Sequence, residues 1–372
     1  MVRTAIVVGG GIGGAAAAAS LAKSGVNVTL YERGKELREI GAGIFLKRNG
    51  LAVLGKIGCY DDVVGKGTWI LRGELWESNG RAFVDRHLPE KAVIVVKRAD
   101  LHSSLVKAAV DYGVTVKTDS IVRGATPNGE LFLEDGRTDK ADLIIGADGV
   151  GSAVRDSLGL NDYIKPTGNG SWRVLVPRAD SDPTSKVVEF WRGHRRVLIT
   201  QSGNDATYVC ASCRDDDRGA ASETFDRKVW GDHFPEFRGL IDRIDPALTS
   251  RRQHIKVRVN GWRKGVVAIL GDAVHGQPPN LGQGAGCAIA NAGALTDILV
   301  ARGDVQVALR EWETEQRKLT EQIQSFSNRY DDVVHAWPLA LESLRTAFVS
   351  AIGTFTPTKM EWARLSQGVK QI

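Results

Sequence analysis

VVGGGIGG at residues 7–14 decides the fold of this chain. The segment follows a short apolar strand and opens an alanine-rich helix, so its GxGxxG glycines stand at a strand-to-helix turn. This context is typical of a dinucleotide-binding βαβ unit, in which a pyrophosphate lies at the positive N-terminus of the helix. The alternative is a glycine-rich turn that binds nothing. The residues predicted to surround the pyrophosphate are Gly9, Gly11, Ile12, Gly13 and Gly14.

Glu32 follows the next apolar strand, residues 26–31, and stands 18 residues after Gly14. An acidic residue near this offset accepts hydrogen bonds from a ribose in dinucleotide-binding units. The neighbouring Arg33 is a residue type that accommodates a phosphorylated ribose. We therefore expect both side chains near the ribose, and the choice of nucleotide stays open.

The composition is that of an ordinary globular protein. The chain has 372 residues, of which 42% are hydrophobic and 25% charged, enough for two or three structural units with a large core. Its net charge of +5 is mild, and acids separate the basic residues, as where Arg214 and Arg218 flank three aspartates. We therefore expect no nucleic-acid partner; a basic pocket for an anionic substrate or cofactor fits better.

Hydropathy and cysteine usage predict a cytoplasmic protein with no membrane partner. The start has no apolar leader pattern, and no later stretch approaches 18 uncharged apolar residues. Four cysteines are too few for a secreted disulfide scaffold. Cys210 and Cys213 match CxxC, but residues three apart on a strand point to opposite faces. This favours two packed thiols over a redox pair.

A β-rich block interrupts the nucleotide-binding unit. Strand-like patterns occupy most of residues 171–258, and an apolar strand at 266–270 resumes the first unit. Beyond residue 304, apolar residues recur at helical intervals, which predicts a long packing helix, with a partner-binding helix as the alternative. The predicted units are a discontinuous nucleotide-binding domain (1–67, 92–165 and 260–330), a β-rich substrate domain (68–91 and 166–259) and a C-terminal helical segment (331–372).

Two further segments, IIGADGVGSAVR at 144–155 and ILGDAVHGQPPNLGQGAG at 269–286, carry a resemblance. With the N-terminal turn, they resemble the single-component (group A) flavoprotein aromatic hydroxylases, the family of the 4-hydroxybenzoate and salicylate hydroxylases. The resemblance extends to about residue 330. GAGIFLKRNGLAVL at 41–54 is most similar to the hydroxypyridine-carboxylate oxygenases of that family. It implies an α/β fold: a Rossmann-like FAD-binding domain of the 4-hydroxybenzoate hydroxylase type, an inserted β-sheet substrate domain and C-terminal helices.

The resemblance also assigns cofactor-binding roles. Asp272 would bind the flavin ribityl chain or the pyrophosphate, and the loop from Pro278 to Gly286 would lie along the flavin ring. Arg98 would face phosphate or ribityl oxygens, and Asp148 would cap backbone near the cofactor. The alternatives are a surface charge for Arg98 and an Asp-Gly turn for Asp148. The remaining expected cofactor contacts are Gly43, Val122, Gly282, Gln283, Gly284, Ala285 and Gly286.

Two departures from the family pattern lie near the expected flavin ring. Gly286 stands where many relatives have Asn, and Lys47-Arg48 replace a more usual residue-Pro pair. We therefore expect the side chains around the flavin ring to differ from the family pattern at these positions.

The β-rich block is expected to supply the substrate wall. Arg173 and Arg196 alternate with apolar residues on predicted strands, and an arginine on such a strand usually meets an anion. By the resemblance to the hydroxypyridine-carboxylate oxygenases, Arg196 would bind a substrate carboxylate or ring oxygen and Tyr208 would hydrogen bond or stack, with Arg173 nearby and Pro279 beside the reacting ring. The alternatives are internal ion pairs for both arginines and a core tyrosine.

The resemblance implies an FAD-dependent monooxygenase that uses NAD(P)H, with NADH favoured, and O2 as co-substrate. Its substrate would be a hydroxypyridine carboxylate such as 5-hydroxynicotinate, hydroxylated with or without ring opening. One alternative is a hydroxybenzoate or salicylate-type hydroxylase, and another is a flavin-binding protein without hydroxylase activity. His275 is predicted to have a structural or flavin-side role, and no metal is expected because no HxH or HxxxH pair occurs. We expect a monomer or homodimer.

Overall fold

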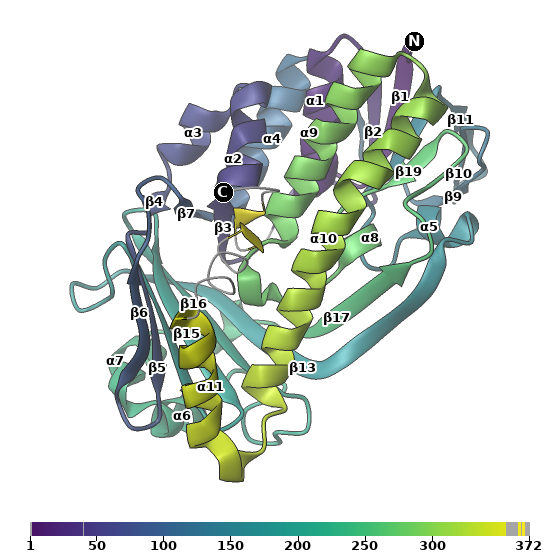
Figure 1. Ribbon diagram of the computed structural model, residues 1–372. Helices are drawn as coiled ribbons and strands as arrows, with labels where there is room; N and C mark the ends of the chain where they lie inside the picture. The colour runs from purple at the N-terminus through teal and green to yellow at the C-terminus, as the bar shows by residue number, and fades with distance from the viewer. Residues whose placement is uncertain (1, 40, 355–363, 366, 369–372) are drawn as a thin grey trace.

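The computed structural model describes the chain except residues 1, 40, 355–363, 366 and 369–372. A six-stranded sheet with the order β18-β19-β12-β1-β2-β8 forms the nucleotide-binding unit (Figure 1). All its neighbours pair in parallel except β18 and β19. This arrangement confirms the predicted βαβ unit. The strands are β1 (Thr4–Val8), β2 (Asn27–Tyr31), β8 (Thr115–Lys117), β12 (Leu143–Gly146), β18 (Arg263–Lys264) and β19 (Val267–Ile269).

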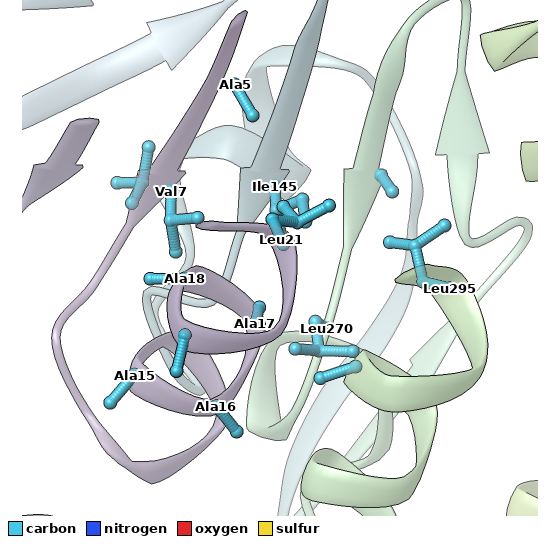
Figure 2. Close-up of a cluster of buried hydrophobic side chains, with 14 of the residues drawn as sticks. Ala5, Val7, Ala15, Ala16, Ala17, Ala18, Leu21, Ile145, Leu270 and Leu295 are labelled. Atoms are coloured by element: carbon cyan, nitrogen blue, oxygen red, sulfur yellow. The ribbon is translucent and has the colours of Figure 1, made fainter. Parts of the chain in front are cut away.

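Helix α1 (Ile12–Lys23) is buried on nearly every side. Its alanines from Ala15 to Ala19 are at most 1% exposed. It packs between α4 (Arg98–Asp111) and α9 (Gly284–Arg302). Figure 2 shows Ala16 and Ala17 on the side of this helix toward Leu270, in the main hydrophobic core. Because an alanine carries only a methyl group, the neighbouring helices approach α1 closely, which explains the alanine run.

Two small antiparallel sheets flank this unit. The first has the order β3-β7-β4 and the second β11-β10-β9. The sheet β3-β7-β4 lies beside the C-terminal half of the nucleotide-binding unit, because β3 contacts α9. Their strands are β3 (Gly43–Lys47), β4 (Thr68–Trp69), β7 (Val93–Lys97), β9 (Val122–Ala125), β10 (Glu130–Leu133) and β11 (Thr138–Lys140).

A seven-stranded sheet with the order β17-β13-β16-β15-β14-β5-β6 forms the second layer of the molecule. It joins strands from the two segments that the sequence analysis assigned to a substrate domain. Only β14 and β5 pair in parallel. The strands are β5 (Arg72–Glu77), β6 (Ala82–His87), β13 (Asn161–Pro177), β14 (Lys186–Arg192), β15 (Arg195–Ser202), β16 (Ala206–Arg214) and β17 (Arg251–Val259).

The two faces of this sheet pack against different neighbours. On β16, Tyr208 and Cys210 form a small cluster with Ala42, next to β3. Cys213 points to the opposite face and packs with aromatic residues that include Trp230 of α6 (Arg227–His233). The face with Tyr208 is therefore the one toward the nucleotide-binding unit. Both cysteines are buried and free, which confirms two packed thiols.

Two long helices follow the last parallel strand. By length and composition alone, α9 could cross a membrane. It is the one such helix among the described residues, it contains the charged Asp297, and 56% of its most apolar window is buried inside the structure. Burial against α1 and α2 accounts for that composition.

The remaining α-helices and the 3₁₀ turns connect these elements. The helices are α2 (Arg48–Ile57), α3 (Tyr60–Val64), α5 (Ala153–Ser157), α7 (Arg238–Ile241), α8 (Asp272–His275), α10 (Val305–His335) and α11 (Glu342–Thr354), and the 3₁₀ turns are η1 (Pro235–Phe237), η2 (Pro246–Leu248), η3 (Pro279–Leu281) and η4 (Leu339–Leu341).

Two of the expected domain boundaries fall inside single elements. Strand β13 begins at Asn161, before the boundary at 165, and α10 continues past 330 to His335. Helix α10 contacts both α9 and β15, so one helix packs against both layers. The division of the chain into three units stays a prediction.

Candidate active site

The turn between β1 and α1 has the geometry that a pyrophosphate requires. Gly9 has a φ of +96°, in the left-handed region that favours glycine. A Cβ atom on Gly14 would stand 1.9 Å from the carbonyl oxygen of Gly9. Gly11 begins α1 without a side-chain cap, so the first N–H groups of this helix, which include those of Ile12 and Gly13, are free to bind an anion.

Glu32 and His102 hold the peptide unit of Gly10 in this turn. The Glu32 carboxylate accepts hydrogen bonds from the backbone N–H of Gly10 and of Gly34, each at 2.7 Å. The buried His102 ring contacts the Gly10 carbonyl through Nε2 at 2.6 Å. Arg33 is exposed. Glu32 therefore lies at the turn, as the ribose role requires, and its carboxylate also fixes the turn itself.

Arg98 starts α4 and lies beside the same turn. Its guanidinium donates two hydrogen bonds to Glu39, at 2.7 and 3.1 Å. A Cβ atom on Gly11 would be 3.4 Å from the Glu39 carboxylate, so this ion pair borders the predicted pyrophosphate position. Arg98 is thus a paired cation next to the turn and differs from an isolated surface charge.

Asp148 and Asp272 lie at one edge of the parallel sheet. Val8 is paired with Gly146, and Gly146 with Ile269, so the carboxyl ends of β1, β12 and β19 are adjacent. The residues that follow these strands form the crevice in which open α/β sheets bind ligands. The predicted cofactor residues from three separate segments therefore meet at one place.

The two aspartates have different surroundings. Asp148 accepts hydrogen bonds from Ser152 Oγ at 2.5 Å and from the Val154 N–H at 3.2 Å, and burial raises its pKa. It therefore caps backbone at the start of α5, as the resemblance implies. Asp272 is exposed at the start of α8, after Gly271 with a φ of +65°. Its carboxylate is open to a hydroxyl donor.

The loop from Pro278 to Gly286 connects η3 to α9. Gly282 has a φ of +59°, and a Cβ atom there would be 2.9 Å from the Cβ of Phe45 on β3. Helix α9 begins at Gly284 without a side-chain cap, so the N–H groups of Gly284, Ala285 and Gly286 face outward from a 19-residue helix. This N-terminus can stabilise negative charge, which suits a reduced flavin.

The glycine at 286 has a local reason. Asn49 donates a hydrogen bond to Gln283 Oε1 at 2.9 Å, directly beside this position. A Cβ atom on Gly286 would be 2.8 Å from that oxygen and 3.1 Å from the Asn49 amide oxygen. The Asn of many relatives would therefore collide with these two side chains.

Two of the predicted flavin contacts lie at the margins of the site. A Cβ atom on Gly43 would be 2.8 Å from the ring of Tyr208, so β3 lies directly against the seven-stranded sheet. Val122, at the start of β9, is half-buried and packs against the main core. The structure thus places Gly43 where β3 meets the seven-stranded sheet, and Val122 against the core of the nucleotide-binding unit.

The sheet presents a mostly apolar wall to this site. Leu175 pairs with Tyr208 and Arg173 with Cys210, which places all four side chains on one face. Tyr208 is 5% exposed, burial raises its pKa, and its ring meets Phe45 edge-on at 6.4 Å. Arg173 is half-buried, and its guanidinium makes no hydrogen bond or ion pair with any residue that the structure describes.

Arg196 does not have the free guanidinium expected of a substrate anchor. Its side chain is 2% exposed and forms two hydrogen bonds with Glu189, at 2.5 and 3.0 Å. The third contact runs from Nη1 to Asn280 Oδ1 at 3.2 Å. The geometry therefore matches the alternative of an internal ion pair. The physical reason is Glu189, which stands on the adjacent strand β14.

Asn280 joins the loop beside Pro279 to a buried polar cluster on α10. Its Nδ2 donates to Asp331 Oδ1 at 3.0 Å and to the Ser327 carbonyl at 3.3 Å. Asp331 is fully buried and also accepts a hydrogen bond from Asn169 and contacts His254 Nδ1 at 3.0 Å. Pro279 itself is half-buried in η3. The cluster fixes the loop that carries it.

His275 lies behind the loop. It is 1% exposed, burial lowers its pKa, and neither ring nitrogen has a hydrogen-bond partner among the described residues. It borders a cavity of about 260 Å³ that Trp262 and Asn328 also line. Across the described part of the chain, no group of three or more His, Cys, Asp or Glu side chains could hold a metal.

Sequence reasoning missed several residues that the site uses. Asn280 lies within the quoted loop motif, and Glu189 is an acid inside an otherwise apolar strand, so both carried a signal. Glu39, His102 and Asp331 stand in ordinary polar surroundings in the sequence. Their importance comes from contacts with segments far along the chain.

Comparison with known proteins agrees with this geometry. Residues 2–327 match the FAD binding domain family. A 2-heptyl-3-hydroxy-4(1H)-quinolone synthase of Mycobacteroides abscessus is 35% identical, over 87% of this chain and 88% of the relative. A 6-hydroxynicotinate 3-monooxygenase of Bordetella bronchiseptica is 29% identical, over 87% and 90%.

A solved structure extends the likeness to the whole fold. The tetrameric form of 2-methyl-3-hydroxypyridine-5-carboxylic acid oxygenase has a TM-score of 0.87 and 32% identity to this chain, and the match covers 100% of this chain and 98% of that one. The FAD-binding segments and the seven-stranded sheet are thus both part of the match. The chain therefore belongs to the FAD binding domain family, and it is a single-component, FAD-dependent aromatic monooxygenase.

Proposed function

We propose that this enzyme hydroxylates a hydroxylated N-heteroaromatic acid, such as 5-hydroxynicotinate, with a reduced nicotinamide nucleotide and O2. One observation carries the proposal. Arg173 presents a guanidinium that pairs with no residue in the described part of the chain, on an apolar wall beside Tyr208. A half-buried cation without an acid is stabilised by an anionic ligand, and a planar guanidinium matches a carboxylate. The names of the pyridine-acid relatives support the same substrate class.

Separate sets of residues in this chain would bind the cofactor and the substrate. The β1–α1 turn, Glu32 and Arg98 would hold the adenine dinucleotide portion, Asp272 the ribityl chain, and the amides at the start of α9 the ring. Bound FAD would supply the oxygen chemistry. No second GxGxxG turn occurs in the sequence, so the nicotinamide nucleotide would bind transiently.

On the substrate side, the residues orient the ring and exclude water. Arg173 would anchor the carboxylate at one edge of the ring. Tyr208, whose raised pKa keeps its hydroxyl protonated, would donate a hydrogen bond or stack. Phe45, Leu175 and Leu198 would keep the site dry, which strengthens these polar contacts and protects the oxygen-transfer step from water.

A second candidate is hydroxylation of an alkylquinolone. Relatives with 33 and 35% identity carry quinolone synthase names, so this substrate has direct support from sequence. An alkylquinolone has no carboxylate, however, and would leave the guanidinium of Arg173 without an anion. We therefore rank the ring acid first.

The test is NADH oxidation by the purified enzyme with each candidate substrate, with product mass as the readout. Strong stimulation by 5-hydroxynicotinate with one added oxygen supports the proposal. Turnover only with 2-heptyl-4-quinolone, or only with hydroxybenzoates, would replace the substrate class. Arg173→Met should raise the KM for the acid about 10- to 100-fold, the loss expected for a charged hydrogen bond. The same panel with NADPH, and sizing for a monomer or homodimer, completes the assignment.

A further inference from the structure

Lys47 is the last residue of β3, at the opposite end of this strand from Ala42, whose carbonyl accepts a hydrogen bond from the Arg98 N–H. Side chains alternate along a strand, so Gly43, Phe45 and Lys47 of β3 share one face. Gly43 and Phe45 both meet Tyr208 on this face. Lys47 therefore points toward the seven-stranded sheet, and its Nζ donates a hydrogen bond to the Leu281 carbonyl at 2.7 Å.

No acid accompanies this lysine among the described residues. Its one hydrogen-bond partner there is a neutral carbonyl, and no carboxylate lies within ion-pair distance. The charged group that faces it from β6 is Arg86, a second cation. From α9 it is faced by the thiol of Cys287, whose pKa burial raises to about 12, so this thiol is neutral. A half-buried ammonium in these surroundings is stabilised by an anionic ligand.

We propose that Lys47 binds the ring hydroxyl oxygen of the substrate as an oxyanion, opposite the carboxylate held by Arg173. This inference rests on the proposed function and names the substrate class more narrowly: a ring with an anionic oxygen at each of two edges. The two cations suit different groups. The planar fork of Arg173 matches two carboxylate oxygens, whereas Lys47 is a point charge. One of its three N–H donors is on Leu281, and two remain for a single oxygen.

The surroundings of Lys47 also give the pH range of this contact. Burial and then Arg86 lower its pKa to about 8. The ammonium is therefore present at neutral pH and is lost as the pH rises above about 8. Affinity for a hydroxylated ring should fall over this range in the wild-type enzyme. Lys47→Arg should retain affinity there, because an arginine stays protonated.

The test measures ligand binding to the FAD-loaded enzyme from absorbance changes, without turnover. The two probes are 5-hydroxynicotinate and nicotinate, which lacks the hydroxyl group. Wild-type enzyme should bind 5-hydroxynicotinate with its hydroxyl ionised, seen as the absorbance band of the anion. Lys47→Met should weaken this ligand about 10- to 100-fold and remove the band, with nicotinate binding unchanged. Lys47→Arg should restore both signals, and Lys56→Met, at an exposed position of α2, serves as the matched control.

The outcomes separate this inference from the proposed function. If wild-type enzyme neither binds nor hydroxylates 5-hydroxynicotinate, both proposals fail. If it does both and Lys47→Met behaves like wild type, only the role of Lys47 fails. An equal loss of nicotinate binding, or a loss of FAD, would also overturn it, because Lys47 would then support the loop or the cofactor.

Discussion

Arg173 and Arg196 stand on the same face of one sheet, yet their guanidinium groups have opposite surroundings. Arg196 is fully enclosed and bound by Glu189 and Asn280. Arg173 has neither an acid nor an amide within reach among the described residues. At the scale of single residues, the partner of a cation therefore decides its role. Arg196 stabilises the wall, and Arg173 can receive a ligand.

For Arg196→Met we predict a loss of stability of about 3–5 kcal/mol, the usual cost of leaving one member of a buried ion pair uncompensated. Urea unfolding of the purified variant measures it. The double variant Arg196→Met with Glu189→Met should recover much of the loss, because no buried charge then lacks a partner. A single variant that unfolds like wild type and only raises the substrate KM would show that Arg196 binds substrate after all.

Gly14→Ala should abolish FAD binding. The added Cβ would stand 1.9 Å from the Gly9 carbonyl oxygen, so the helix and the turn must separate. The absorbance of the purified protein reports bound flavin. Gly55→Ala in α2 is the matched control, since its Cβ would meet nothing within 4 Å and alanine favours helix. A yellow Gly14→Ala protein would argue against the pyrophosphate role of this turn.

At the scale of elements, α10 carries the polar cluster that supports the flavin-side loop. Asp331 and His335 stand one turn apart on its buried face, and His335 Nδ1 contacts the His194 carbonyl at 2.8 Å. Asp331 reaches the loop through Asn280. Helix α10, which packs against both layers, thus holds the loop that is predicted to border the flavin.

His335 makes the stability of this helix pH-dependent. Burial lowers its pKa to about 4, so between pH 6.5 and 4 the unfolded chain binds a proton that the folded chain does not. The stability that the folded protein gains by keeping His335 neutral is complete above about pH 6.5 and is lost as the pH falls. Between pH 7 and pH 5, the free energy of unfolding should fall in both proteins, by about 2 kcal/mol less in His335→Gln than in wild type. Unfolding at both pH values measures it, with exposed His87→Gln as control; equal losses would exclude His335.

Asp331→Asn should separate NADH oxidation from hydroxylation. The amide keeps one acceptor oxygen in place of the two that serve Asn280, Asn169 and His254. The loop is then held less firmly, so more NADH should yield hydrogen peroxide and less should yield product. The ratio of product to NADH measures this effect. Asp332→Asn, exposed and next in sequence, should leave the ratio unchanged. A normal ratio in Asp331→Asn would show that the loop keeps its position without this contact.

At the scale of the whole molecule, FAD should act as a structural link. Its predicted contacts come from β1, α4, β12, α8 and the loop before α9, which are distant in the chain. A ligand at 100 times its Kd stabilises the folded state by about 2.7 kcal/mol. Removal of FAD should therefore lower the Tm and re-addition restore it. FMN, which lacks the adenylate half, should restore less; an equal effect of FMN would mean that the β1–α1 turn contributes little.

Local patterns predicted much of this architecture. The βαβ unit, the strands of the β-rich block and the long helix after residue 304 all follow from hydrophobic period and glycine placement, and the structure confirms them. The start of β13 at Asn161 was missed because its first residues are mostly polar and exposed. Pairing with β17 extends this strand, and that pairing depends on a segment almost a hundred residues away.

By itself, the sequence determined the dinucleotide turn, the family and the wall on which a substrate would bind, because these depend on local conformation and on motifs of fixed spacing. Only the tertiary structure decided which cations are free. Arg196 meets Glu189 because β14 and β15 pair in one register, and Lys47 lacks an acid because no described carboxylate folds beside it. Charge pairing depends on distances between atoms of remote segments, and spacing along the chain does not set those distances.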